Sequence, residues 1–255
     1  MNRPPLRVAV LCSHRAPGLV HVLTRDRNRG RLYDIACCLT SEAGFAEEVR
    51  VARRGIPILS HPIQTFYASA GRPLEDLEAR RDYDARTVRK LAPYRPDVVL
   101  LSSYLYVLTQ PMLDAFPGRI VNIHHADLLA RRPDGGPRYP GLRAVQDAML
   151  AGETETRATA HLVTRELDGG PVLLRSWPFP VPEAARWAIA RQASDVLRAL
   201  AFAQTEWMLR SAWGPMIVRS LQMMAHGAAE PPLELVEDGS VRRLHPDEFT
   251  EAVAV

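Results

Sequence analysis

The sequence predicts an α/β fold with a doubly wound, mainly parallel sheet and a short C-terminal extension. Three observations favour this class. Strand-like runs alternate with runs of helical periodicity over roughly the first half of the chain. The run 97–102 (DVVLLS) is almost continuously apolar, as expected for a strand that helices cover on both faces. The segment 74–91 has a 3.6-residue period and a charged face, which is typical of an amphipathic helix.

The expected elements of the first half follow in order. Strands are expected over 7–11, 33–39, 56–59, 97–102 and 119–124. Helices are expected from about residue 18 and over 44–54, 74–91 and 112–116. In sheets of this kind, ligands bind beyond the carboxyl ends of the strands. A functional site is therefore expected where these strands end.

After residue 124 the pattern changes. A loop rich in Pro, Gly and Arg precedes an expected helix and strand, and the elements predicted here are a loop over 130–139, a helix over 142–151, a strand over 156–164, a strand over 172–181 and a helix over 183–212. Prolines in 172–181 predict an edge strand, because proline cannot donate to a strand ladder. The Asp238-Gly239 pair within LELVEDGSVRRL predicts a β-hairpin. We expect a main domain over 1–212 and an extension over 213–255.

Composition narrows the class of protein. The chain has 255 residues, 47% of them hydrophobic and 24% charged, as in ordinary globular proteins. A net charge of +3 is too small to predict a nucleic-acid partner. No apolar run approaches the roughly 20 residues of a membrane span. Cys12, Cys37 and Cys38 have the spacing of neither a disulfide framework nor a metal site. These features predict a cytoplasmic protein with no membrane partner, and a homodimer stays possible.

The first polar feature is the stretch RIVNIHHADLL, in which Asn122 and His124 lie two residues apart. On a strand they would point to the same side. For either side chain by itself, a structural role is the favoured interpretation: Asn122 bonding to backbone at a strand end, and His124 as a hydrogen-bonded core histidine. His125 and Asp127 raise the alternative of a metal site. A sequential His-His pair on a strand points in opposite directions, however, and no supporting cluster occurs elsewhere, so no metal is predicted.

The second polar feature is the turn ELDGGP, which lies between two strand-like segments. An aspartate before two glycines commonly does no more than make an Asx-type turn. The combination of this turn with other motifs favours a functional role for Asp168. Asn122-x-His124 ends a strand, a Tyr139-Pro140-Gly141 turn follows, and Asp168 comes in the later glycine turn.

In this combination the sequence resembles the folate-dependent formyltransferase family, whose best-known small member is the phosphoribosylglycinamide formyltransferase of purine synthesis. The family pattern of Asn-Ile-His, Leu-Leu, Tyr-Pro-Gly, a strand and Leu-Asp-Gly-Gly-Pro-Val stands here as residues 122–124, 128–129, 139–141, 161–164 and 167–172. The likeness covers roughly residues 6–210 and is strongest over 97–174. It implies the Rossmann-like formyltransferase fold, with 1–212 as the catalytic domain.

The resemblance also implies the chemistry. 10-Formyltetrahydrofolate would give its formyl group to an amine, and a tetrahedral oxyanion would form. Asn122 and His124 would donate N–H groups to that oxyanion. Asp168 would act as base and relay near His124, through water.

Binding roles follow from the same resemblance. The pterin would lie in an apolar slot lined by Tyr104, Leu105, Tyr106, Val107, Leu108, Val163, Thr164 and Leu167. The acceptor would lie near Ser13, His14, Arg15, Arg138 and Tyr139. The family's purine enzyme usually has arginine at the position of Tyr106.

Two differences from the family pattern lie where the amine acceptor is expected to bind. The loop after the first strand reads Ser13-His14-Arg15-Ala16-Pro17-Gly18, where the purine enzyme has a glycine-rich cradle for a phosphate. The loop 130–138 is longer than the family's usual spacer. We therefore expect a small-molecule amine other than the purine intermediate, with the purine intermediate itself as the alternative. A formyltetrahydrofolate hydrolase and a catalytically silent folate-binding module are the further alternatives.

Overall fold

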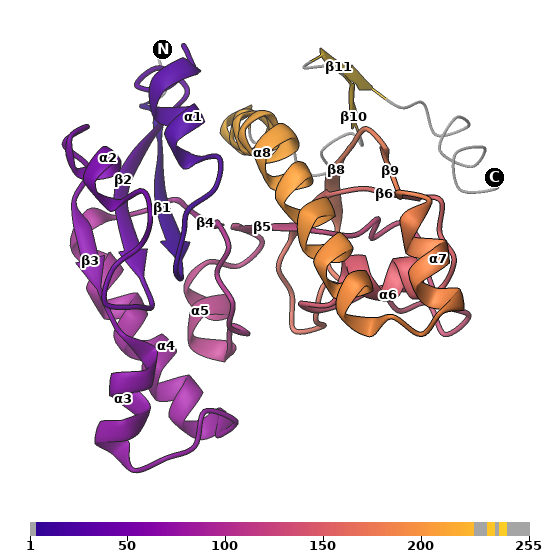
Figure 1. Cartoon of the computed structure of the whole chain (residues 1–255). Helices are drawn as coiled ribbons and strands as arrows, with labels where there is room; N and C mark the ends of the chain where they lie inside the picture. The colour runs from indigo at the N-terminus through magenta and orange to yellow at the C-terminus, as the bar shows by residue number, and fades with distance from the viewer. Residues whose placement is uncertain (1–3, 227–233, 238–239, 244–255) are drawn as a thin grey trace.

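The computed structural model describes residues 4–226, 234–237 and 240–243. Within them, nine strands form one sheet in the order β3-β2-β1-β4-β5-β7-β8-β10-β11, and β6 pairs with β9 separately (Figure 1). The strands are β1 Leu6–Cys12, β2 Tyr33–Thr40, β3 Ile58–Ser60, β4 Val98–Leu101, β5 Ile120–His124, β6 Glu155–Thr156, β7 Thr159–Leu162, β8 Val172–Ser176, β9 Phe179–Pro180, β10 Glu234–Glu237 and β11 Ser240–Arg243. The helices are α1 Leu19–Arg25, α2 Glu48–Ala52, α3 Ile63–Ala70, α4 Leu77–Leu91, the 3-10 helix Ala92–Tyr94, α5 Gln110–Ala115, α6 Ala144–Leu150, α7 Ala184–Ala190 and α8 Ser194–His226.

Strand β1 shows why the sheet is doubly wound. It pairs in parallel with β2 on one side and with β4 on the other. Val8 and Val10 are buried in a core that includes residues of α1 and α8. Ala9 and Leu11, on the opposite face, are buried in a second core with residues of α4 and α5. Burial of both faces requires the continuous apolar strands seen in the sequence. The predicted α/β class with a mainly parallel arrangement is confirmed.

The second half of the sheet runs antiparallel next to β5. Strand β7 pairs antiparallel with β5, so that Asn122 lies opposite His161 and His124 lies opposite Thr159. Strand β8 pairs antiparallel with β7 and in parallel with β10. The prediction of an edge strand over 172–181 is therefore wrong for β8. The prolines fall after β8, where the chain leaves the sheet and β9 pairs with β6.

The C-terminal extension includes a paired set of strands. β10 and β11 pair antiparallel, with Val236 opposite Val241, as the hairpin prediction required. The Asp238-Gly239 turn lies outside the described residues.

Helix α3 was not among the predicted elements. It begins after Pro62 and ends at Gly71, whose φ of 62° is left-handed. Phe66 and Tyr67 are buried in a small cluster with Tyr83 of α4. The segment is short and bounded by Pro and Gly, so it has the sequence appearance of a loop.

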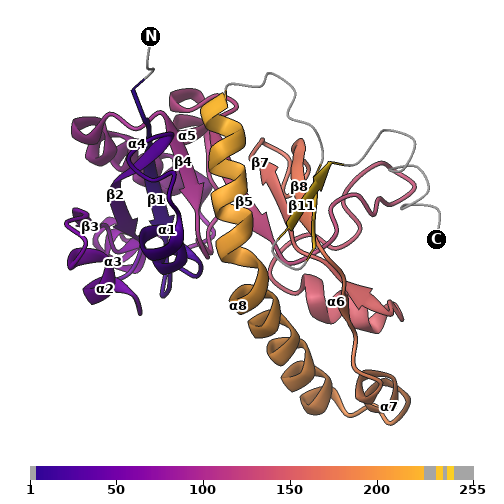
Figure 2. The same cartoon turned by 90° about the horizontal axis from the view of Figure 1, so that it is seen from above.

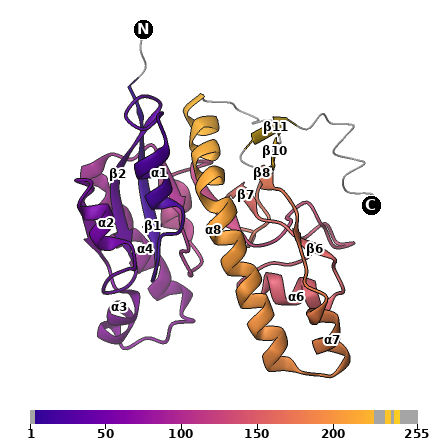
Figure 3. The ribbon, with the colours of Figure 1, turned by 45° about the horizontal axis from the view of Figure 1, so that its top comes forward.

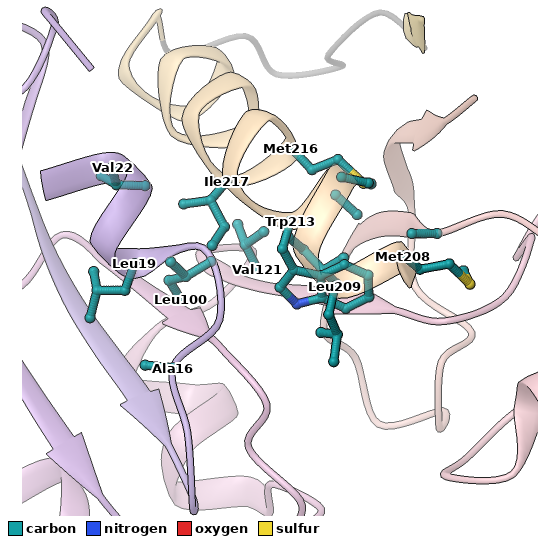
Figure 4. Close-up of a cluster of buried hydrophobic side chains, with 14 of the residues drawn as sticks. Ala16, Leu19, Val22, Leu100, Val121, Met208, Leu209, Trp213, Met216 and Ile217 are labelled. Atoms are coloured by element: carbon teal, nitrogen blue, oxygen red, sulfur yellow. The ribbon is translucent and has the colours of Figure 1, made fainter. Parts of the chain in front are cut away.

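The predicted helix over 183–212 begins where α7 begins, but it is not continuous and does not end at residue 212. The chain breaks between α7 and α8, and α8 then continues through Pro215 to His226. Proline lacks the N–H that a helix interior uses. Trp213, Met216 and Ile217 are nevertheless buried around this point, against α1, β4 and β5 (Figure 4). Packing energy in this core offsets the missing hydrogen bond, and the expected boundary at residue 212 falls inside the helix.

Helix α8 runs between α1 and the β7–β8 part of the molecule (Figures 2 and 3). The helices approach closely at Gly18 and Gly214. A Cβ on Gly18 would lie 2.8 Å from Cδ1 of Ile217 and 2.9 Å from the backbone nitrogen of Gly214. Gly18 also has a φ of 77°. The glycine after the first loop thus sets the distance between α1 and α8. In the described part of the chain, no helix is long and apolar enough to cross a membrane.

Candidate active site

Three segments meet at the carboxyl end of β5. They are the end of β5 itself, the Tyr-Pro-Gly turn at 139–141 and the turn at 163–171 between β7 and β8. Together with the loop 103–108 that follows β4, they line a cavity of about 290 Å³. Asn122, His124 and Asp168 all lie on its wall. The three side chains that the sequence singled out are therefore brought to one cavity.

His124 is held between two protein oxygens. Its Nε2 lies 2.9 Å from the carbonyl oxygen of Tyr139. A carbonyl only accepts, so Nε2 carries the hydrogen and donates it. The other nitrogen, Nδ1, lies 3.6 Å from Oδ2 of Asp168. The His124 side chain is 8% exposed and that of Asp168 7% exposed. At 3.6 Å the two atoms are beyond direct hydrogen-bond distance, and the expected water between the two groups stays a prediction.

Backbone atoms fix the Asp168 carboxylate. The N–H of Gly141 donates to Oδ2 of Asp168 at 2.8 Å. Asp168 has a left-handed φ of 54°, which aspartate tolerates better than most residues. A Cβ on Gly170 would lie 1.8 Å from the carbonyl oxygen of Leu162, so only glycine fits there. The Gly-Gly turn is tight because its backbone packs against the end of β7.

Asn122 has a partner that sequence reasoning missed. Its Nδ2 lies 3.1 Å from Nε2 of His161, the residue opposite it on β7. Nδ1 of His161 lies 3.1 Å from the carbonyl oxygen of Leu162 and therefore donates to it. Burial lowers the pKa of His161 to about 4, so at neutral pH Nε2 is unprotonated and accepts from Asn122. Oδ1 of Asp168 lies 3.7 Å from the same nitrogen.

His161 could have been found from its position. It stands within the family motif at 161–164, and its strand runs antiparallel beside Asn122. The pairing of β5 with β7 depends on the tertiary structure, however, and the sequence of either strand by itself does not predict it.

The rest of the cavity wall includes many apolar side chains. All eight residues expected for the pterin slot line it: Tyr104, Leu105, Tyr106, Val107, Leu108, Val163, Thr164 and Leu167. Leu105, Val107 and Leu167 are exposed apolar side chains at its mouth. The loop is anchored at Thr109, whose N–H and hydroxyl donate to the buried carboxyl of Asp84. Burial raises the pKa of Asp84 to about 6.

The residues expected at the acceptor site do not gather in this cavity. The Ser13 side chain is fully buried; its Oγ lies 2.8 Å from Oγ of Ser41 and accepts from the N–H of Leu105. His14 is exposed, 3.9 Å from Glu42.

Arg15 forms a two-pronged ion pair with Glu206 of α8, at 2.6 and 3.1 Å. This pairing raises the pKa of Arg15 and lowers that of Glu206. The N–H of Ala16 donates to Oε2 of Glu47 at 2.7 Å, and Pro17 has no N–H. The Arg15 guanidinium and the Ala16 N–H are thus already bonded to carboxylates of the protein.

Arg138 and Tyr139 instead line a second cavity, of about 520 Å³. His125 and Asp127, the metal alternative of the sequence, also lie there. His125 packs on Trp213 with ring centroids 4.5 Å apart, and Asp127 pairs with Arg175. Among the residues that the structure describes, no group of three metal-binding side chains occurs.

Two proteins of known function are similar in sequence to parts of this chain. The Trifunctional purine biosynthetic protein adenosine-3 of Drosophila melanogaster is 31% identical over 174 residues, which cover 67% of this chain and 11% of that protein. The Phosphoribosylglycinamide formyltransferase of Escherichia coli K12 is 35% identical over 99 residues, covering 39% of this chain and 43% of that enzyme. The matched regions thus span less than half of these curated relatives.

Solved structures share the fold. Glycinamide ribonucleotide transformylase 1 from Symbiobacterium toebii has a TM-score of 0.63 and 25% identity, covering 94% of this chain and 95% of that one. A formyltetrahydrofolate deformylase from Pseudomonas syringae has a TM-score of 0.62 and 21% identity, covering 96% and 67%. The sequence model of the family described as Formyl transferase matches residues 6–203. This chain therefore belongs to the formyl transferase family.

Proposed function

We propose that this protein transfers the formyl group of 10-formyltetrahydrofolate, the co-substrate of its family, to the amine of a small molecule other than the purine intermediate. The observation that carries the proposal is the convergence of Asn122, His124 and Asp168 on one cavity with an apolar wall. Polar groups at one end of an apolar slot suit a folate, whose flat ring is held by the slot and whose formyl group reaches the polar end.

The first step is attack of the uncharged amine on the formyl carbon, which forms a C–N bond and puts negative charge on the formyl oxygen. Asn122 has two amide N–H groups, and one of them donates to His161. The second is available to the oxyanion. A preorganised donor of this kind typically contributes about 10²–10³ in rate.

Collapse of the intermediate breaks the bond between the formyl carbon and N10 of the folate. The amine nitrogen loses a proton and N10 gains one, so the products are a formamide and tetrahydrofolate. His124 and Asp168 face each other across 3.6 Å through Nδ1 and Oδ2. We assign the proton transfer to this pair. For His124 to donate to the oxyanion as well, its Nε2–H must leave the carbonyl oxygen of Tyr139.

The loop after β1 supports an acceptor without a phosphate. Arg15 is neutralised by Glu206 and the N–H of Ala16 by Glu47. A phosphate placed there would meet two carboxylates and would have to displace them, which costs electrostatic free energy.

Two alternatives stay open because relatives carry those names. One is the purine intermediate, glycinamide ribonucleotide, as acceptor. The other is hydrolysis, with water in place of the amine, as the name formyltetrahydrofolate deformylase describes. A silent folate-binding module is disfavoured, since the Asn122, His124 and Asp168 set serves no purpose in binding alone.

The test follows tetrahydrofolate release from 10-formyltetrahydrofolate with single amines, with glycinamide ribonucleotide and with no amine. We expect release that depends on an amine and falls about 10²-fold or more in Asn122→Ala and Asp168→Asn. Release only with glycinamide ribonucleotide would establish the purine alternative, and formate release without amine the hydrolase. No turnover with any amine, combined with unaltered folate binding in His124→Ala, would leave only the silent module.

A further inference from the structure

The second cavity, of about 520 Å³, has a charge pattern that the proposed reaction leaves unused. Three arginines line it, and each is paired with one carboxylate: Arg138 with Glu153 at 2.9 Å, Arg157 with Glu155 at 2.9 Å and Arg175 with Asp127 at 2.8 Å. The wall is therefore electrically balanced and offers both donors and acceptors. Such a wall suits a ligand that carries both a negative and a positive or polar group.

Arg175 is unusual among the three. It stands on β8 and is only 3% exposed, whereas the Arg138 side chain is 48% exposed. Nη1 of Arg175 donates to Oδ2 of Asp127, but its Nε has no hydrogen-bond partner among the described residues. A buried donor without a partner is destabilising. A guanidinium presents two forked edges, and the edge that includes Nε is the one that a ligand carboxylate would satisfy.

The cavity adjoins the groups assigned to catalysis. His125 lines both cavities. Tyr139 lines the second cavity, and its carbonyl oxygen accepts from His124 of the first. Ala130 and Arg138, from the long loop at 130–138, form part of the wall. His125 and Tyr139 therefore connect the wall of the second cavity with His124 and the first cavity.

We propose that this second cavity binds the carboxylate of the amine acceptor through Arg175, so that the acceptor is a small amino acid bearing the amine to be formylated. The assignment of the ligand as acceptor rests on the proposed function. One negative charge matches the guanidinium edge of Arg175 whose Nε has no partner among the described residues. A phosphate would bring a second charge among Asp127, Glu153 and Glu155, whereas an ammonium group is stabilised by them. Because the loop 130–138 supplies Ala130 and Arg138 to the wall of this cavity, it contributes to specificity for the acceptor.

The test measures binding to the full chain by isothermal titration calorimetry without folate. The probes are glycine, L-lysine and L-ornithine, and each is compared with its decarboxylated counterpart, which is methylamine, cadaverine and putrescine respectively. We expect at least one amino acid to bind at least tenfold more tightly than its counterpart. In Arg175→Lys, which keeps a positive charge beside Asp127, that affinity falls about 10–100-fold. The matched control is Arg198→Lys, because Arg198 is exposed on α8 and pairs there with the exposed Asp195.

Equal affinity of every amino acid and its counterpart, or no binding by any probe, overturns the proposal. So does unchanged affinity in Arg175→Lys. The comparison of amino acids with their counterparts uses the unaltered protein, so it decides the question even where Arg175→Lys fails to fold. Formyl transfer with equal efficiency to ornithine and putrescine would refute the carboxylate site and leave the proposed function standing. Binding of an amino acid without any formyl transfer would support the carboxylate site and refute the proposed function.

Discussion

The carbonyl oxygen of Tyr139 accepts a hydrogen bond from Nε2 of His124 at 2.9 Å, and two residues later the N–H of Gly141 donates to Asp168. One turn therefore holds both members of the histidine–aspartate pair through its backbone. A backbone contact cannot be removed by truncating a side chain. The roles of the catalytic side chains are therefore best tested by substituting neighbouring residues that hold them in position.

His161 is expected to act as a positioning residue for Asn122. His161→Phe removes the acceptor that orients the amide, so we expect kcat to fall about 10²-fold while KM for the folate changes little. His161→Gln retains an oxygen acceptor and should recover part of kcat. Steady-state kinetics with 10-formyltetrahydrofolate measure both variants. A loss that appears only in KM, or that is equal in the two variants, would contradict the positioning role.

Gly170 and Gly169 offer a matched pair for the turn that carries Asp168. A Cβ at 170 would meet the carbonyl oxygen of Leu162 at 1.8 Å, whereas a Cβ at 169 would meet only the flexible, exposed side chain of Glu166. Gly170→Ala is expected to lower the free energy of unfolding by about 1–3 kcal/mol and to displace Asp168. Gly169→Ala should cost much less. Urea unfolding measures the stability of both variants. Equal losses of unfolding free energy would show that the close contact with the Leu162 carbonyl oxygen is not the cause of the destabilisation.

Acid stability should depend on buried neutral histidines. Burial lowers the pKa of His125 to about 3 and that of His61 to about 4. Between those values and the unfolded value near 6.5, the unfolded chain binds more protons than the folded one. Stability is therefore present above about pH 6.5 and is lost as pH falls through this window.

His125→Phe is the specific test of this dependence. Phenylalanine keeps a ring against Trp213 and removes the unpartnered Nε2. We expect the slope of unfolding free energy against pH to decrease by up to one proton between pH 6.5 and 4, with little change above pH 7. Urea titrations at intervals from pH 4.5 to 8 give the slope. An unchanged slope would mean that the pKa of His125 is not lowered in the folded protein.

Glu206 is expected to keep anions away from the loop after β1. In Glu206→Gln the Arg15 guanidinium loses its paired charge, so inorganic phosphate should bind about tenfold more tightly than to the unaltered protein. Calorimetry with phosphate measures the change. Asp195→Asn removes an exposed carboxylate from the same helix and should have no effect. Tight phosphate binding by the unaltered protein would favour a phosphorylated acceptor instead.

Much of the fold could be predicted because it depends on local patterns. The alternation of apolar strands with amphipathic helices such as 77–91 sets the α/β class, since burial on both faces of β1 and β4 requires that pattern. The motifs at 122–124, 139–141 and 167–172 likewise mark the site because each combines a turn with a reactive or hydrogen-bonding side chain. These features lie within short stretches of sequence.

The tertiary structure alone decided the rest. Helix α8 continues past Pro215 because Trp213 and Ile217 are buried there, and β8 is not an edge strand because β10 pairs with it. Arg15 faces Glu206 across 191 residues, so its charge is neutralised by a partner that its own loop cannot reveal. The sequence by itself determined the family of this chain, and it predicted the chemistry that we propose for the cavity. Long-range packing and pairing decided which of its charged groups are still available to a substrate.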